Sequence, residues 1–158
     1  MVKKANQFRN FKEIEKYIKN NVPNIIMRDR NLERVLKGTM HQSIYDVVYG
    51  HYVPHEYKRR RNNGGLGDAR LMQITEAILD GNKFKIIFEN LAQGNDSLSG
   101  QYLTDTIVEG IEDNWNKTGV WSEPRDFISE TMSKIQADPK PLIEAVKKAF
   151  IKAGFKIK

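Results

Sequence analysis

The sequence predicts a small α+β fold in which an antiparallel β-hairpin, or small sheet, packs against several helices. Residues 70–91 alternate apolar and polar side chains with a period of two, which is typical of a strand with one buried face. Elsewhere apolar residues recur every three or four positions, as in amphipathic helices. The 158 residues suffice for one hydrophobic core and show no internal repeat, so we expect a single domain over residues 1–158.

The hairpin is predicted from two apolar rows on either side of a turn. The first row is interrupted only by a glutamate, and its apolar members are Met72, Ile74 and Ile78. The second row is broken only by Ile87, and its members are Phe84, Ile86 and Phe88. Between the rows lies Asp80-Gly81-Asn82, where Gly and Asn tolerate the positive φ of a hairpin turn.

The length of the turn decides which apolar residues share a face. A three-residue loop pairs the two rows as Ile78 with Phe84 and Ile74 with Phe88. We favour this register because it places both rows on one side. The alternative is a two-residue turn, which places Leu79 beside Phe84 and Ala77 beside Ile86. A hairpin alone is marginally stable in water, so helices must cover its apolar face.

Two helices are predicted before the hairpin. Apolar residues at helical spacing indicate one helix over residues 8–20, and Val22-Pro23 ends it because a residue before proline avoids the α region. Asn31 is a good N-cap for a longer helix that runs to about Tyr49. The buried stripe of that helix is predicted to be Leu32, Leu36, Met40, Ile44, Val47 and Val48. Residues 1–30 are expected as a peripheral N-terminal helical arm.

Three helices are predicted after the hairpin. The first spans about residues 102–116, with Gly110 as an internal weakness. The second follows Ser122 as its cap, and the third follows Asp138 and ends at Gly154. The order of elements is therefore two helices, a hairpin and three helices.

Residues 49–69 form a long connection between the second helix and the hairpin, and we expect this loop to protrude. Pro54 and several glycines forbid a continuous helix, and Asn63-Gly64-Gly65 favours a turn. A connection this long inside a compact domain is usually functional or disordered.

The composition favours a basic protein outside the membrane. The formal net charge is +6, from 26 Lys and Arg against 20 Asp and Glu, and the excess concentrates in Lys58–Arg61 and near the C-terminus. Such a surface can meet nucleic acid or an acidic protein, or it can be a solvated face. No apolar run approaches the ~20 residues of a membrane span, and the N-terminus lacks the apolar segment of a secretory signal. Without cysteine there are no disulfides.

No constellation of residues points to catalysis. His51 and His55 are four positions apart, but Pro54 between them prevents the single helical face that a zinc-binding pair needs. The segment Gly64–Gly67 lacks the lysine and the strand–loop–helix context of a phosphate-binding loop. No serine lies in a nucleophile-elbow sequence. We therefore expect no enzyme activity, metal, cofactor or small-molecule substrate.

The loop that carries the basic run is the best candidate site. Tyr49, Tyr52 and Tyr57 lie close to Lys58–Arg61, and arginine and tyrosine together suit three uses. They can bind phosphates and stack on bases, as in a nucleic-acid-binding module. They can anchor a protein interface, where both residue types are enriched. One arginine can also stay inside the subunit, paired to Asp68 or Glu56, and hold the loop.

Residues along most of the chain resemble a family of tailed-phage head–tail connector, or tail-completion, proteins, which are also described as neck or minor capsid proteins. The first matching block is Val48-Tyr49, Tyr52, Pro54, Tyr57, Arg59-Arg60, Gly64-Gly65-Leu66 and Asp68. The second is Asn90, Gly100, Tyr102-Leu103, Ile107–Gly110, Trp121, Pro124–Ile128 and Thr131. The closing segment Phe150–Phe155 is similar too. The resemblance covers roughly residues 45–155.

The resemblance implies a structural virion protein, assembled in the host cytoplasm, that forms a homo-oligomeric ring of six or twelve copies. The ring would complete or terminate the tail and join it to the head connector. Its expected partners are tail-tube and head-connector or adaptor proteins, with DNA in the channel as a further one. The residues expected to contact a neighbouring subunit or partner are Tyr52, Tyr57, Arg59, Arg60, Gly64, Gly65, Leu66, Asp68, Pro124, Arg125 and Asp126.

Overall fold

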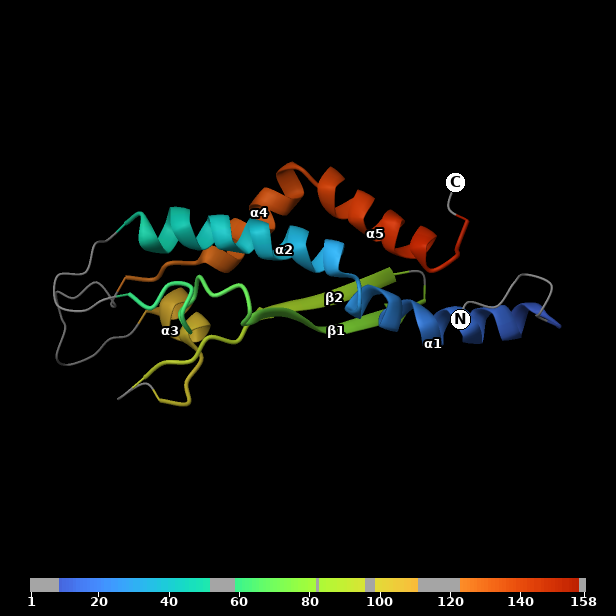
Figure 1. The fold of residues 1–158 in the computed structure, drawn as a ribbon, viewed down its shortest axis with the longest axis horizontal. Helices are drawn as coiled ribbons and strands as arrows, with labels where there is room; N and C mark the ends of the chain where they lie inside the picture. Colours follow the sequence, from blue (N-terminus) through green and yellow to red (C-terminus); the bar gives the residue numbers. More distant parts are fainter. Residues whose placement is uncertain (1–8, 52–58, 82, 96–98, 111–122, 157–158) are drawn as a thin grey trace. The chain divides into compact units, whose positions relative to one another are not determined.

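The computed structural model describes residues 9–51, 59–81, 83–95, 99–110 and 123–156. This part of the chain contains helices and one two-stranded sheet, in which β1 (Met72–Asp80) pairs with β2 (Lys83–Asn90) (Figure 1). The predicted α+β class is confirmed.

The chain divides into two compact units, and each draws on segments that are distant in sequence. The hairpin unit consists of Met1–Leu36, Ile74–Phe88 and Pro139–Lys158. The loop unit consists of Lys37–Gln73 and Glu89–Asp138. That residues 1–158 act as one domain stays a prediction.

In the hairpin unit, α1 (Phe11–Met27) packs against α5 (Lys140–Lys152). Small residues on α5 allow a close approach, because Ala145 and Ala149 are both buried. The buried apolar side chains of this unit are Val22, Ile26, Leu32, Leu36, Ile74, Ala77, Ala145 and Ala149.

Helix α1 is longer than predicted because it continues through Pro23. A proline inside a helix removes one backbone donor and crowds the carbonyl four residues before it. Side-chain amides bond to other carbonyls of this stretch: Asn21 Nδ2 donates to the Tyr17 carbonyl at 2.7 Å, and Asn24 Nδ2 donates to the Asn20 carbonyl at 3.1 Å. Burial of apolar residues on either side of the proline favours continuing the helix, so the predicted end at Val22-Pro23 is wrong.

Helix α2 (Arg30–Ser43) also begins earlier than predicted. Its first turn is capped by the buried carboxylate of Asp29, which accepts from the Asn31 N–H at 3.0 Å and the Leu32 N–H at 2.9 Å. The helix continues into η2 (Ile44–Tyr49), a short π-helix. The predicted buried stripe is confirmed at Leu32, Leu36, Met40, Ile44 and Val48, while Val47 is half-buried.

The register of the hairpin changes along its length. Ile74 is buried, as the favoured three-residue loop requires, but nearer the turn Ala77 is buried and Ile78 is 37% exposed. The strands end at Asp80 and begin again at Lys83, with two positions between them. Near the turn the favoured register is therefore wrong, and the two-residue alternative describes the burial.

In the loop unit, α4 (Phe127–Ala137) packs against η2. Lys134 of α4 forms an ion pair with Asp46 of η2 and a second one with Glu130, at 3.4 Å. Phe127 is fully buried. The buried apolar side chains of this unit are Met40, Ile44, Val48, Leu66, Met72, Ala92, Ile107 and Phe127.

Two helix boundaries in the loop unit differ from the prediction. Helix α3 (Leu103–Glu109) ends before Gly110, whose φ of 76° lies outside the α-helical region, so the predicted continuation through this glycine is wrong. The remainder of the predicted helix, residues 111–116, lies outside the described residues. Helix α4 is capped by Asp126, whose side chain accepts from the Ser129 N–H at 2.8 Å. The predicted cap, Ser122, lies outside the described residues. In the hairpin unit, helix α5 follows Pro139 and not Asp138.

Candidate functional site

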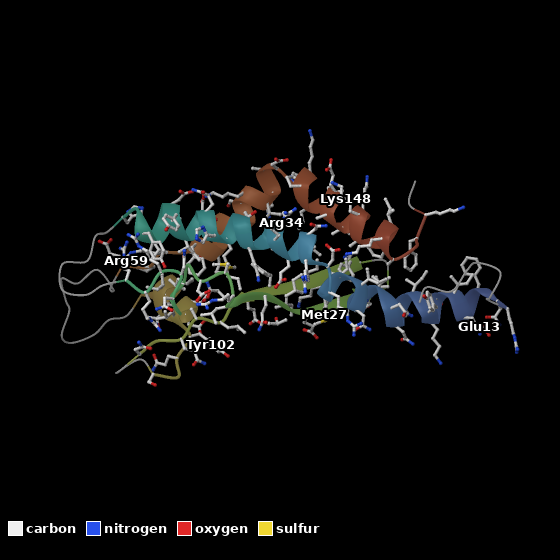
Figure 2. All side chains as sticks on the ribbon, viewed as in Figure 1. Glu13, Met27, Arg34, Arg59, Tyr102 and Lys148 are labelled. Carbon is white, nitrogen blue, oxygen red and sulfur yellow. The ribbon has the colours of Figure 1, made fainter. Side chains whose placement is uncertain are left out.

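The candidate site is the described part of the long connection, residues 59–70, which we call the arginine loop. It belongs to the loop unit. Its basic side chains are Arg59, Arg60, Arg61 and Arg70, of which Arg59 is labelled in Figure 2. The predicted contact residues Tyr52 and Tyr57 lie outside the described residues.

Tyr49, the last residue of η2, holds the two ends of the arginine loop. Arg59 Nη1 donates to the Tyr49 carbonyl at 3.0 Å, and its guanidinium carbon lies 5.0 Å from the centre of the Tyr49 ring. The Tyr49 hydroxyl accepts from the Gly67 N–H at 3.0 Å. Burial raises the pKa of this hydroxyl. One tyrosine therefore ties the beginning of the loop to its end by a hydrogen bond on each side and a cation–π contact.

Arg60 ties the loop to a segment more than thirty residues further along the chain. Its Nη2 donates to the Gln93 carbonyl at 2.5 Å, and its Nη1 donates to the Asn95 side chain at 3.1 Å. The planar guanidinium suits this task because it presents several donors in a fixed geometry. Arg60 is thus an internal brace of the loop unit.

Asp68 is the carboxylate around which the loop turns. It is 3% exposed and accepts from the Gly64 N–H at 2.9 Å and the Arg70 N–H at 3.0 Å. The Arg70 guanidinium meets it with Nε at 2.9 Å and Nη2 at 2.6 Å. The guanidinium first, and then the Gly64 N–H, hold the pKa of Asp68 well below its usual range. The loop's ion pair therefore involves Arg70, and the Asp68 side is buried.

The glycines are required by the tightness of the turn. Gly64 has φ of +80°, a conformation that side chains rarely adopt. A Cβ on Gly65 would lie 2.8 Å from the Arg61 backbone nitrogen and 2.9 Å from its carbonyl oxygen. Arg61 itself has φ of 43°, in the left-handed region. The arginine loop is thus a compact turn in which backbone packs on backbone.

Leu66 and Asn90 connect the loop to the base of the hairpin. Leu66 is buried, and its carbonyl accepts from Asn90 Nδ2 at 2.7 Å. Asn90 Oδ1 accepts from the Ala92 N–H at 3.1 Å, and the Asn90 carbonyl accepts from Thr104 Oγ1 at 3.1 Å. The buried Asn90 side chain therefore links the arginine loop to the chain that follows β2. Because Gly65–Asp68 are buried, this part of segment 49–69 is packed and does not protrude.

The second predicted contact block divides into a buried residue and two exposed ones. Arg125 is 8% exposed, and its N–H donates to the Ile107 carbonyl at 2.8 Å. Asp126 is exposed and caps α4, and its bonds to the Ser129 hydroxyl and N–H lower its pKa. Pro124 is exposed. Of this block, only Pro124 and Asp126 lie at the surface of the loop unit.

Among the described residues there is no group of three or more His, Cys, Asp or Glu side chains placed to hold a metal ion. His51 is exposed, and the other member of the predicted pair, His55, lies outside the described residues. The helices of the described chain are too short or too polar to cross a bilayer. The described contacts of the candidate site are hydrogen bonds that hold the arginine loop in place.

The sequence model of the YomN family matches residues 10–152, which is nearly the whole chain. The chain belongs to the YomN family. This family name is phage-derived, and the protein is therefore phage-associated. No curated protein and no solved structure matches the chain. The phage origin that the resemblance implied is confirmed, while a place in the head–tail connector stays a proposal for this YomN member.

Sequence reasoning missed the two residues of the YomN chain that organise the loop. Tyr49 was expected as a stacking surface, and Asn90 only as part of a matching block. The sequence did contain a signal for Asn90, which is a polar residue at the end of an apolar alternation. A polar side chain at such a buried position needs hydrogen-bond partners, and Asn90 has one in the Leu66 carbonyl. Tyr49 gave no comparable signal, since its partners come from ten and eighteen positions further along the chain.

Proposed function

We propose that this YomN-family chain is a structural virion protein of a tailed phage, assembled in the host cytoplasm. In this role it forms a homo-oligomeric ring at the neck or tail end, completes the tail and joins it to the head connector. The observation that carries the proposal is the match of residues 10–152 to a family whose name is phage-derived. The position in the neck rests on the matching blocks of the resemblance. The proposed role is non-catalytic.

Exposed apolar side chains of the hairpin unit support a role in assembly. Phe11 is 87% exposed at the beginning of α1, and the next members of its stripe, Ile14 and Ile18, are half-buried. On α5, Ile143 and Ile151 are 48% and 57% exposed. Large apolar side chains that form a contiguous exposed patch are typical of surfaces that another protein covers, and Ile143 and Ile151 are exposed on the same helix.

The described contacts of the arginine loop count against the predicted use of its arginines between copies, because the guanidinium groups are used inside the subunit. Arg59 and Arg60 donate to Tyr49 and to Gln93 and Asn95 of the same chain. Of the three uses that the sequence allowed, this one matches the described contacts. The proposal therefore assigns the loop to shaping the subunit and assigns the joint between copies to other surfaces.

The nucleic-acid alternative receives less support from the described residues. Three of the four arginines of the loop, Arg59, Arg60 and Arg70, are bonded within the chain, although the Arg70 side chain is 75% exposed. The net charge of +6 still provides weak, salt-dependent attraction to phosphates.

The test is the mass of the purified full chain, measured by size-exclusion chromatography with light scattering and examined by negative-stain electron microscopy. We expect closed rings, and we expect the labelled chain at the head–tail junction of the assembled particle. A chain that remains monomeric at every concentration, and that is absent from the particle, would contradict the proposal.

A further inference from the structure

Within the described chain, the sheet of the hairpin unit has no third strand beside β1 or β2. The sheet has two strands, β1 of nine residues and β2 of eight, so each strand pairs on one side only. Edge strands of this length are templates for pairing with another chain. Two strands alone are also marginally stable, so a further strand would stabilise the hairpin.

The two strands carry opposite charges close to the turn. On β1 the exposed charged residues there are acidic, Glu76 and Asp80. On β2 they are basic, Lys83 and Lys85. Ile78, which is 37% exposed, shares the parity of the two acidic residues and lies between them on the same strand face. Each strand therefore presents a charge pattern that is the complement of the other.

We propose that the hairpin is the joint between copies of this chain, with β1 of one copy pairing along β2 of the next. The inference rests on the proposed function and identifies the surface by which the ring closes. In this joint Glu76 and Asp80 of one copy lie close to Lys83 and Lys85 of its neighbour. Opposite charges on adjacent strands stabilise their pairing, whereas like charges directly opposite each other destabilise it.

Charge decides against the symmetric alternatives. Pairing β1 with a second β1 would set carboxylates against carboxylates, and pairing β2 with a second β2 would set lysines against lysines. Lysines on an edge strand therefore act against the wrong partner while matching the right one. A joint that uses different edges on its two sides is heterologous, and it closes into a ring when the rotation between copies allows.

Rotational symmetry also sets the direction of pairing. Copies in a ring are related by rotation about one axis, so hairpins that run along this axis have their turns at the same end. Neighbouring β2 and β1 strands are then antiparallel, and the charged positions near the turns lie at similar heights. Ile78 would be covered in this arrangement, because the aliphatic stems of lysines can pack against an apolar side chain.

The test is a set of charge reversals in the full chain. Lys83→Glu with Lys85→Glu makes the tip of the hairpin all acidic, and Glu76→Lys with Asp80→Lys makes it all basic. The four-residue swap combines them and restores complementary edges with the signs exchanged. The control, Lys12→Glu with Lys16→Glu, makes the same charge change as the first variant on exposed positions of α1, on the helix face away from Phe11.

We expect each double reversal to raise the protein concentration at half-assembly by about tenfold or more, measured by light scattering. The four-residue swap should restore assembly, the two opposite double reversals should assemble when mixed, and the control should match the unchanged chain. Circular dichroism and thermal unfolding confirm that each variant is folded.

The outcomes distinguish a failure of the proposed hairpin joint from a failure of the proposed ring. If the unchanged chain forms rings and the double reversals assemble equally well, or if the four-residue swap fails to restore assembly, the hairpin joint is wrong and the proposed ring stands. If the unchanged chain is monomeric, the proposed ring is wrong and the joint with it.

Discussion

At the scale of single residues, the arginine loop is shaped by contacts that leave no room for larger side chains. Gly65 packs on the Arg61 backbone, and Gly67 packs on Tyr49, where a Cβ would lie 3.3 Å from a ring carbon and from the hydroxyl oxygen. The Asp68 carboxylate is buried and accepts hydrogen bonds from backbone N–H groups and from the Arg70 guanidinium. Substitutions here test the loop directly.

Gly65→Ala and Gly38→Ala should change stability in opposite directions. The Cβ at Gly65 would meet backbone atoms at 2.8 and 2.9 Å, which cannot move cheaply, so we expect a loss of about 1–3 kcal/mol. A Cβ at Gly38, inside α2, meets nothing within 4 Å, and alanine is the better helix former by about 1 kcal/mol. Urea unfolding of the two variants measures both effects, and a neutral Gly65→Ala would contradict the tight turn.

Asp68 should make the protein sensitive to acid. Its pKa in the folded chain is held below that of the unfolded chain, about 3.9, so its contribution is present above that pH and is lost as the pH falls below it. Asp68→Asn cannot ionise. We therefore expect the difference in unfolding free energy between the unchanged chain and this variant to be large at pH 7 and smaller at pH 3.

The control for acid sensitivity is Asp105→Asn, the same change at an exposed position. The interpretation of Asp68 would be wrong if the difference between Asp68→Asn and the unchanged chain were the same at both pH values.

At the scale of elements, side chains at the helix ends decide where helices begin and end. Asp29 and Asp126 supply acceptors for first-turn N–H groups, and Gly110 allows the chain to leave α3. The π-helix η2 also ends with a specific hydrogen bond at its last residues. Its Gly50 N–H donates at 2.8 Å to the carbonyl of Tyr45, five residues before it.

The cap of α2 gives a prediction that separates two neighbouring residues. Asp29→Ala leaves the Asn31 and Leu32 N–H groups without their acceptor, so we expect a loss of about 0.5–2 kcal/mol. Asn31→Ala removes only an exposed bond from Arg34, at 3.3 Å, and should be close to neutral. Chemical denaturation of the pair measures this, and equal losses would return the cap to Asn31.

At the scale of the whole molecule, the net charge of +6 and the use of its arginines have different consequences. Charge acts at long range and attracts any polyanion, whereas Arg59 and Arg60 make short internal bonds. A change at these arginines is therefore expected to affect folding before it affects binding.

Arg59→Ala with Arg60→Ala should lower the midpoint of thermal unfolding and leave the salt dependence of DNA binding nearly unchanged. The slope of log affinity against log salt reports how many phosphates the protein neutralises. Fluorescence anisotropy with a short duplex over a range of salt measures it. A slope that falls by about two with an unchanged melting temperature would favour the nucleic-acid-binding module.

Much of the fold could be predicted because its signals are local. The stripe from Leu32 to Val48 lies on one helical face, and the alternation around Phe84 lies on one strand face, so neighbours in sequence report the burial. The end of α1 was mispredicted because a local rule about Pro23 was overruled by burial on both sides of it. The hairpin register was mispredicted near the turn because a parity change is invisible in a simple alternation.

The position of the candidate site in the chain could be predicted from the sequence, but the contacts of its side chains could not. The sequence by itself determined the α+β class, the hairpin, the buried stripe of α2 and the position of the basic loop, because these depend on the periodicity of adjacent residues. Only the tertiary structure decided that Arg60 reaches Gln93, that Tyr49 receives Arg59 and Gly67, and that Asp68 pairs with Arg70. The contacts of Tyr49 with Gly67 and of Arg60 with Gln93 span eighteen and thirty-three residues, so they depend on how the chain returns on itself, which packing determines and local pattern does not record. The pair of Asp68 with Arg70 is only two residues apart, but several arginines lie close to Asp68 in the sequence, and the structure decides which of them it binds.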